Sequence, residues 1–504
     1  MPLLTERKTG RIMSGSPWRL YEVKPPELAA DEREVYEAVI GAALRDYSSA
    51  DLQELFMRDR KKELFVEQVV DLAARLKQFS GSLFTAEQEK AIVESVTQFV
   101  NEVFPKLKKP EKVVRLLIQD LVGLGKLTPL LEDDELEEVM VNGPKQEAFV
   151  IDRRYGPCKS NVRFESVEEL TKLVQRIAMF VGKTVSPHDP LLDARLPDGS
   201  RVNATVQPAA PFGPAITIRK FKKRPMSIVD VIESGTMPSE VAAFLWLAVD
   251  GMGVRPMNLL VSGITGSGKT TTLNSLSIFV PPSERIVTIE DTLELNLSGR
   301  ENWVQLESKP GVREEPIVLD DLLKNALRMR PDRIFVGEVR GSEALTMFVA
   351  MDLGHRGLMS TLHANSAQET ILRLQSPPMS VPVSLFTLLD LVIMQHRLAT
   401  PQGMVRRITQ VSEVSVLGEN VLLNNVYDWN RERFALERTQ IPSQMLEKLG
   451  FHLGKTRNDV KRELDNRTKV LDFLVRGKVR DPLKIQEIIN AYIKAPSKVL
   501  ESIG

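Results

Sequence analysis

The sequence predicts an α/β protein whose carboxyl-terminal half is built on a parallel sheet covered by helices on both faces. Short apolar stretches alternate there with helical segments, a rhythm typical of open parallel sheets. The predicted strands are Asn258–Val261, Arg285–Ile289, Arg333–Val336 and Leu358–Leu362. A glycine-rich stretch follows the first strand, and acidic or histidine residues follow the others, at the positions where such sheets bind ligands.

The chain has 504 residues, which is too many for one hydrophobic core, so about two to four domains are expected. Its 42% hydrophobic and 27% charged residues are typical of a folded globular protein. The 67 Lys and Arg balance the 67 Asp and Glu, so the whole molecule has no net field that attracts nucleic acid or anionic lipid. The densest basic patch, Arg219–Arg224, is interpreted as a solvated linker, with phosphate or partner contact as the alternative.

Cysteine usage and hydropathy restrict the class of protein further. Cys158 is the single cysteine, which excludes an intramolecular disulfide framework and a multi-cysteine zinc site. The first residues lack an apolar core of signal-peptide length, and no apolar run reaches about 18 residues. The longest candidate, Ala242–Val249, is far shorter. These patterns predict a cytoplasmic location, peripheral at the membrane through partners.

Four regions are expected along the chain. Residues 1–110 form a mostly helical region, 111–221 a small α/β domain, 222–237 a linker, and 238–504 the parallel-sheet domain with a helical carboxyl-terminal segment. Residues 1–25 show no clear period and are expected to be a flexible or loosely docked arm.

Hydrophobic periodicity predicts the individual elements outside the parallel sheet. Helices are predicted over Asp31–Asp46, Val167–Phe180, Ser239–Asp250 and within Pro442–Leu500. Strands of the small domain are predicted at Ala148–Ile151 and Ala215–Ile218. The pattern is mixed after about Val405.

The stretch Gly263–Thr270 (GITGSGKT) satisfies the phosphate-loop pattern G-x-x-x-x-G-K-[ST] and lies between a predicted strand and a predicted helix. Glycines let backbone N–H groups converge on a phosphate, because side chains would block the approach. Lys269 would bind the β- and γ-phosphates, and the Thr270 hydroxyl would bind Mg²⁺. The helix that begins there adds its dipole. The residues expected around the nucleotide are Gly263, Thr265, Gly266, Ser267, Gly268, Lys269, Thr270 and Thr271.

Acidic residues that could hold a metal and orient water follow two of the predicted strands. Glu290, Asp291 and Glu294 come after Arg285–Ile289, and Glu338 follows the next strand. Carboxylates after apolar strands can reach the same pocket as the phosphate-loop lysine. The alternative for each is a helix cap or a surface acid.

Two histidines, His355 and His363, bracket the predicted strand Leu358–Leu362. A lone histidine is usually structural. The chain has only five histidines, and two of them stand at the ends of this one strand. Phosphate contact and a structural role are therefore about equally favoured for them. A zinc site is rejected because no cysteine partners lie nearby.

Four separated motifs resemble, in order and spacing, those of the type II secretion and type IV pilus assembly ATPases, within the type II/type IV secretion ATPase superfamily. GITGSGKTTTLN is similar to their Walker A motif, IEDTLEL to their acidic box, and LRMRPDRIFVGEVRG to a Walker B motif that carries glutamate. GHRGLMSTLHANSA, followed by Arg373, resembles their histidine box. The resemblance spans about residues 125–420, including DGSRVNATVQPAAPFGPAITIRKF, and is nearest to archaeal type II secretion, archaellum and pilus motors.

The resemblance implies a RecA-like core preceded by a PAS-like small domain, and a homohexamer that hydrolyses ATP with Mg²⁺. It also implies a polytopic membrane platform protein as partner, through which pilin-like or secreted subunits are moved. Glu294 would polarise the attacking water, Glu338 would help hold Mg²⁺ through its water shell, and His363, with His355 as a second candidate, would contact the γ-phosphate. Arg201 and Arg219 would act as arginine fingers across a domain or subunit boundary.

The sequence departs from the family pattern in two places. It cannot carry the four-cysteine zinc insertion of many bacterial members, so neither zinc nor partners of that insertion are expected. His355 and His363 are eight residues apart (363 − 355), as in some conjugation-type relatives. This spacing leaves open which histidine contacts the γ-phosphate. A retraction or conjugation-type secretion motor is the alternative function, because the motifs do not separate these motors from assembly motors.

Two further readings come from other functional classes. A nucleic-acid translocase is disfavoured by the zero net charge and the lack of interleaved basic and aromatic residues. A nucleotide-binding scaffold without turnover is disfavoured by the complete set of Lys269, Thr270, Glu294 and Glu338.

Overall fold

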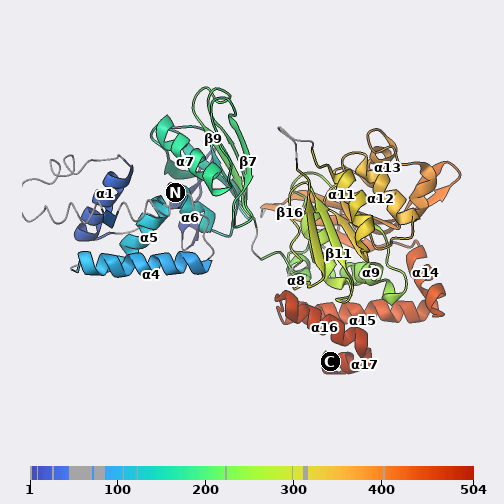
Figure 1. Ribbon diagram of the computed structural model, residues 1–504. Coiled ribbons are helices and arrows are strands. Elements are labelled where there is room, and N and C mark those ends of the chain that lie inside the picture. Colours follow the sequence, from blue (N-terminus) through green and yellow to red (C-terminus); the bar gives the residue numbers. More distant parts are fainter. Residues whose placement is uncertain are drawn as a thin grey trace, which may run out of the picture. The chain divides into compact units, whose positions relative to one another are not determined.

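The computed structural model describes residues 3–7, 9–24, 28–44, 71–72, 86–105, 107–121, 123–221, 224–297, 299–309, 316–400 and 403–503. The chain divides into two compact units, Met1–Lys223 and Arg224–Gly504 (Figure 1). Each unit contains a nine-stranded sheet and its own buried apolar clusters.

The amino-terminal unit is built on a sheet with the strand order β1-β2-β3-β6-β5-β4-β9-β8-β7. Its strands are β1 Leu3–Glu6, β2 Gly10–Met13, β3 Arg19–Val23, β4 Leu136–Val141, β5 Glu147–Asp152, β6 Gly156–Arg163, β7 Leu191–Arg195, β8 Arg201–Thr205 and β9 Ala215–Arg219. Its described α-helices are α1 Ala30–Leu44, α4 Ala86–Val103, α5 Pro110–Leu121, α6 Thr128–Glu132 and α7 Val167–Phe180. Neighbouring strands are antiparallel except for β3 and β6, which are parallel.

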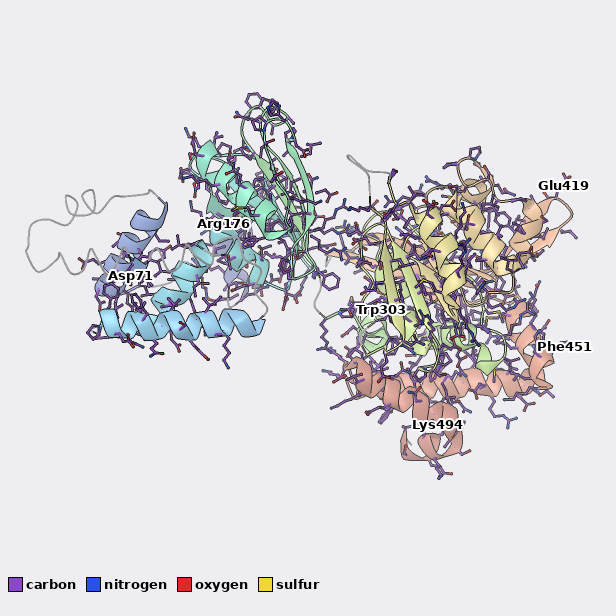
Figure 2. All side chains as sticks on the ribbon, viewed as in Figure 1. Asp71, Arg176, Trp303, Glu419, Phe451 and Lys494 are labelled. Atoms are coloured by element: carbon purple, nitrogen blue, oxygen red, sulfur yellow. The ribbon has the colours of Figure 1, made fainter. Side chains whose placement is uncertain are left out.

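Helix α7 confirms the prediction made from its apolar period. Ser166 caps it by accepting a hydrogen bond from the Glu169 N–H, and the apolar face packs into the same cluster as the strands. Arg176, labelled in Figure 2, extends from α7 and donates to the carbonyl oxygens of Asp120 and Gly123 at 2.8 and 2.9 Å. These bonds attach α7 to the end of α5.

The prediction of a flexible arm over residues 1–25 is wrong for the described part of that segment, which forms β1, β2 and β3. Arg7 contacts Asp133 at 3.1 Å and Asp152 at 2.6 Å, and the Tyr21 hydroxyl donates to Asp133 at 2.6 Å. The strands were missed because they are short and few of their side chains are buried, so the sequence shows no clear period there. The PAS-like character of this unit stays a prediction.

The carboxyl-terminal unit is built on a sheet with the order β12-β11-β13-β14-β10-β15-β16-β17-β18. Its strands are β10 Leu259–Ser262, β11 Ile286–Glu290, β12 Trp303–Glu307, β13 Arg333–Val336, β14 Met359–Leu362, β15 Leu391–Thr400, β16 Gly403–Leu417, β17 Asn420–Asn430 and β18 Ala435–Arg438. Its α-helices are α8 Ile228–Glu233, α9 Ser239–Asp250, α10 Lys269–Leu276, α11 Leu319–Ala326, α12 Glu343–Asp352, α13 Ala367–Gln375, α14 Gln444–Leu453, α15 Arg457–Arg476, α16 Pro482–Lys494 and α17 Pro496–Ile503.

Strands β10 to β15 are parallel, and all four strands predicted from apolar stretches are present. Alternate residues of one strand supply two different cores: Leu259 and Val261 of β10 join the cluster around α9, and Leu260 joins the cluster around α11 and α12. Helices therefore cover both faces of the sheet, as the sequence predicted. The region of mixed pattern after Val405 is an antiparallel extension, β16 to β18.

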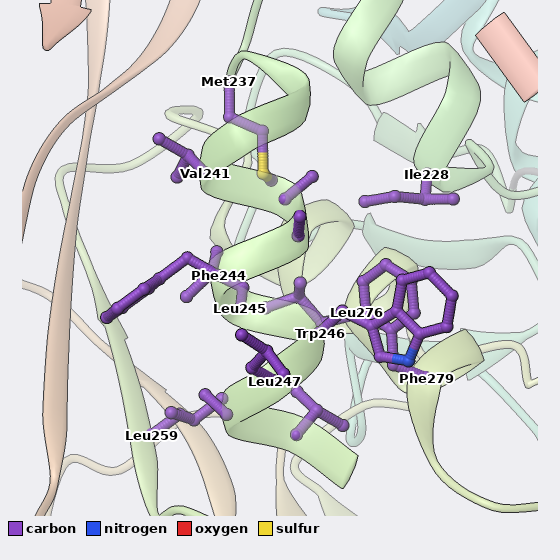
Figure 3. Packing of buried hydrophobic residues seen from close by; sticks show 14 of the residues in the cluster. Ile228, Met237, Val241, Phe244, Leu245, Trp246, Leu247, Leu259, Leu276 and Phe279 are labelled. Carbon is purple, nitrogen blue, oxygen red and sulfur yellow. The ribbon is translucent and has the colours of Figure 1, made fainter. Parts of the chain in front are cut away.

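Helix α9 is the centre of the larger core. Trp246 is fully buried and stacks on Phe279 with ring centroids 5.1 Å apart, and Figure 3 shows the pair beside Leu276. The long helix α15 packs against α9 and places Arg467 over the Trp246 ring at 4.7 Å. The carboxyl-terminal helices, drawn in red in Figure 1, thus complete the core of this unit.

The predicted linker over residues 222–237 is wrong in its described part, which contains α8. Ser227 and Asp230 form a capping box that starts this helix, and Ile228 and Val229 are buried. The start of this helix was missed because a charged, proline-containing stretch directly precedes Ser227 and is typical of a linker. This helix belongs to the carboxyl-terminal unit, which begins at Arg224.

Candidate active site

The phosphate loop, Gly263–Thr270, joins the end of β10 to the start of α10. Gly266 and Gly268 have φ angles of 73° and 95°, which glycine adopts without the strain that a side chain adds. Gly263 is required for space, because a Cβ there would lie 2.1 Å from the carbonyl oxygen of Gln395. Three glycines therefore shape the loop, two through their backbone angles and one through close packing.

Lys269 is the first residue of α10, and only 7% of it is exposed. Its Nζ lies 3.3 Å from the Ile264 carbonyl oxygen and 3.4 Å from Nε2 of His363. Burial lowers the pKa of the Lys269 ammonium, and the charges of Glu338 and Glu294 oppose that shift. One cation is thus held inside the loop within electrostatic reach of both acids.

Glu338 follows β13 and connects two further groups. Its Oε1 lies 3.2 Å from Nε2 of His363, and Arg340 donates to its two oxygens at 2.9 and 2.8 Å. The Arg340 side chain is 64% exposed, so solvent screens the pair and little free energy is needed to open it. Burial, and then the charge of Lys269, lower the pKa of His363, so its ring is neutral at pH 7.

A buried carboxylate organises the acidic segment that follows β11. Glu290 is 2% exposed, and its Oε2 accepts hydrogen bonds from the N–H groups of Glu294 and Leu295 at 2.8 and 2.9 Å. Oδ1 of Asn274, on α10, accepts from the N–H of Asn296 at 2.8 Å. The backbone on both sides of Glu294 is therefore fixed, whereas the Glu294 side chain is exposed.

The segment after β13 is fixed in the same way. Glu343 is 7% exposed, and its Oε1 accepts from the N–H groups of Arg340 and Gly341. A Cβ on Gly337 would lie 2.9 Å from Cγ of Glu290. Close packing between the two acidic segments therefore brings Glu338 to the same sheet edge as Glu294.

Residues 120–430 match the family described as type II/IV secretion system protein, which covers more than half of the chain. An uncharacterized protein of Methanocaldococcus jannaschii is 31% identical over 85% of this chain and 78% of its own length. The chain belongs to the type II/IV secretion system protein family. The resemblance expected from the four motifs is confirmed, and this family member is an ATPase whose core is a parallel sheet with an antiparallel extension.

Other relatives of this type II/IV secretion protein have narrower coverage. The type IV secretion system protein PtlH of Bordetella pertussis is 35% identical over 57% of this chain and 93% of PtlH. Among solved structures, the VirB11 ATPase of the Brucella suis type IV secretion system, in complex with sulphate, is 29% identical over 57% of this chain and 92% of its own, with a TM-score of 0.30. None of the described helices has both the length and the apolar character that a membrane crossing needs.

The donor set of the secretion ATPase fits a bound phosphate chain. Ser267 is fully buried, and its Oγ has no hydrogen-bond partner among the described residues, as expected for a group that awaits a ligand. Thr270 is half-buried in the first turn of α10, where N–H groups lack helical partners. Thr265 is exposed at the tip of the loop, and Thr271 is half-buried.

The structure does not bring His355 to the phosphate loop of this family member. Strands β10 and β14 are parallel, and the loop follows β10 just as His363 follows β14. His355 precedes β14 and therefore lies at the opposite edge of the sheet.

The two predicted arginine fingers belong to the amino-terminal unit. Arg201 and Arg219 are paired across β8 and β9, and Arg195 pairs with Arg201 across β7 and β8. Arg201 also donates to Asp193 at 3.2 and 2.7 Å. The three arginines form one row at the same end of three neighbouring strands, and their action at a phosphate stays a prediction.

Three residues at the site were not predicted as members of it. Arg340 stands two positions after Glu338 within the Walker B motif, and that closeness was a usable signal. Gln395 and Arg406 contact the loop from β15 and β16. No local pattern marks them, because they reach the loop only through the pairing of β15 with β10 and β16.

Proposed function

We propose that this chain is the motor of a homohexamer that hydrolyses ATP to drive assembly or secretion of pilin-like subunits through a polytopic membrane platform protein. It would work on the cytoplasmic side of the membrane and reach the membrane through that partner. The observation that supports the proposal is the line of contacts from Lys269 to His363 to Glu338 beside a glycine-shaped phosphate loop.

The chain's own groups divide the chemical work. Loop amides, the α10 terminus and Lys269 bind the phosphates and offset their charge. Glu294, whose backbone Glu290 holds in place, would polarise the attacking water. Neutral His363 can donate a hydrogen bond to the γ-phosphate from a position next to Lys269 and Glu338.

Mg²⁺ fits the same residues, since hydroxyl and carboxylate oxygens are the ligands it prefers. Thr270 would bind it directly, and Glu338 would bind it through water. When bound, the ion neutralises charge on the phosphate oxygens. Arg340 occupies both Glu338 oxygens in this structure, and its exposed pair with Glu338 is weak enough to be exchanged.

The location of the two predicted arginine fingers supports the proposed ring. Arg201 and Arg219 lie in the amino-terminal unit, outside the unit that carries the loop. If these cations stabilise the transition state from across a domain or subunit boundary, one copy alone has an incomplete site. Nucleotide would then favour one arrangement of the units over another, which converts hydrolysis into movement.

The decisive experiment compares phosphate release by the purified wild type and Glu338→Gln with magnesium and ATP. The wild type should release phosphate and should be a hexamer by mass photometry. Glu338→Gln should bind ATP, but its rate of phosphate release should fall at least about a hundredfold. Glu432→Gln, an exposed carboxylate on the β17–β18 turn, is the matched control and should behave as wild type. Equal rates for the wild type and Glu338→Gln would defeat the assignment.

A retraction or conjugation-type motor remains the second candidate, and PtlH, a type IV secretion system protein, shares 35% identity with this chain. Cross-linking and purification from membranes would identify the platform protein, and the substrate of that partner separates the two functions. Stimulation of the ATPase by DNA that falls steeply with salt would instead support a nucleic-acid translocase.

A further inference from the structure

We propose that Arg406 is a positioning residue of the nucleotide site, which holds the Gly266–Ser267 peptide in the orientation that closes the turn of the phosphate loop. The inference rests on the proposed function and adds a residue from β16 to the loop, the acids and the histidine described above.

Arg406 lies along the outside of the phosphate loop. Its Nε donates to the carbonyl oxygen of Gly266 at 3.0 Å. A Cβ built on Gly268 would lie 3.2 Å from Cδ of Arg406, so the aliphatic part of the side chain packs on this second glycine. One side chain therefore spans two of the three glycines that shape the loop.

The hydrogen bond from Arg406 to Gly266 also fixes the direction of the next N–H, because the peptide between Gly266 and Ser267 is planar and trans. The C=O and N–H of one peptide point in opposite directions. When the guanidinium holds the Gly266 oxygen on its own side, the Ser267 N–H points to the other side, where it donates to the Ile264 carbonyl oxygen at 3.2 Å and closes the turn of the loop. Ser267 is fully buried, and its Oγ has no partner among the described residues. A charged donor also strengthens the bond and polarises the peptide that carries the N–H.

Arg406 is carried by strand β16, which pairs with β15. Arg406 is paired across the strands with Arg397, whose Nη1 lies 3.9 Å from the Cβ position of Gly266. Gln395, 1% exposed, accepts a hydrogen bond from Oγ1 of Thr272 at 2.8 Å, which attaches the hairpin to α10. Strands β15 and β16 thus contact both the loop and α10, and they place two cations beside Gly266.

This role predicts which part of the nucleotide is affected. A residue that fixes the backbone of the phosphate loop affects how the phosphates are bound and does not affect how the base and the ribose are bound. Arg406→Ala should therefore weaken the binding of ATP, ADP and inorganic tripolyphosphate by the same factor, about tenfold, because the charge-assisted hydrogen bond to the loop is lost.

The test measures dissociation constants for ATP and ADP, and the inhibition constant of tripolyphosphate against ATP hydrolysis, on the full chain. Arg406→Ala should raise all three together, and KM should rise more than kcat falls. Arg406→Lys, which keeps a charged donor, should recover to within about threefold of wild type. Arg433→Ala removes an exposed arginine that pairs with Glu437 and should change nothing.

Two results would overturn the inference. One is that all three constants are unchanged in Arg406→Ala. The other is that ATP and ADP bind more weakly while the inhibition constant of tripolyphosphate is unchanged, which would show that Arg406 acts on the base or the ribose. Thermal unfolding midpoints check that the variants fold, and Arg406→Gln replaces Arg406→Ala if the latter does not. A wild type that releases no phosphate refutes the proposed function, whereas an active wild type matched by Arg406→Ala refutes only this inference.

Discussion

Replacing Glu290 with glutamine tests whether a buried carboxylate controls the acid proposed to polarise water. Glu290 is buried, with 2% of it exposed, and its Oε2 accepts hydrogen bonds from the N–H groups of Glu294 and Leu295. Glutamine keeps the length of the side chain and one acceptor oxygen, but it removes the charge. The substitution therefore weakens the support of the Glu294 segment without opening a cavity.

The magnitude follows from the two bonds. A hydrogen bond to a charged group contributes about 1.5–3 kcal/mol, and a neutral one about 0.5–1.5 kcal/mol. The loss is therefore about 1 kcal/mol for each bond and about 2 kcal/mol for the pair. If the Glu294 segment must hold its position during hydrolysis, kcat should fall by about 30-fold, since about 1.4 kcal/mol is tenfold. Nucleotide affinity should be nearly unchanged, because the phosphate loop is intact.

Steady-state phosphate release gives kcat, and competition with a fluorescent nucleotide gives the dissociation constant. Glu301→Gln, an exposed carboxylate in the segment before β12, is the matched control. A Glu290→Gln enzyme with wild-type kcat and a wild-type unfolding midpoint would show that the position of Glu294 does not depend on this carboxylate.

Three further substitutions test the core and the site. Trp246→Ala removes the fully buried ring that stacks on Phe279, so urea unfolding of its unit should show a loss of about 3–5 kcal/mol; a loss below about 1 kcal/mol would contradict the packing. Arg467→Met leaves the buried Asp250 carboxylate, which Arg467 contacts at 2.7 Å, without its cation. The free energy of unfolding should fall by about 3–5 kcal/mol in urea titrations, and adding Asp250→Asn should recover part of the loss. Burial lowers the pKa of His363 below 6.5, so the unfolded chain binds a proton there at higher pH than the folded chain does. The free energy of unfolding should therefore fall as the pH drops through and below 6.5, and His363→Gln should remove that component, as urea titrations at several pH values would measure.

The parallel strands and the loop after β10 were predictable because local patterns determine them. Each strand is an apolar run bounded by polar residues, since both of its faces are buried. The loop is recognisable because a phosphate cradle needs glycine, lysine and threonine at fixed spacing. Strands β1 to β3 and helix α8 were mispredicted, because the three short strands bury few side chains and the α8 cap lies next to a charged stretch.

The sequence by itself determined the chemistry of this protein: the order of the elements in its parallel sheet, and which residue types stand where strands end. Only the tertiary structure decided which of those residues meet. It separated His355 from His363 because a strand has two ends, and it brought Arg406 to Gly266 because β15 lies beside β10. Local spacing specifies what a residue can do, whereas strand pairing between distant segments specifies its neighbours, and no short window of sequence contains that information.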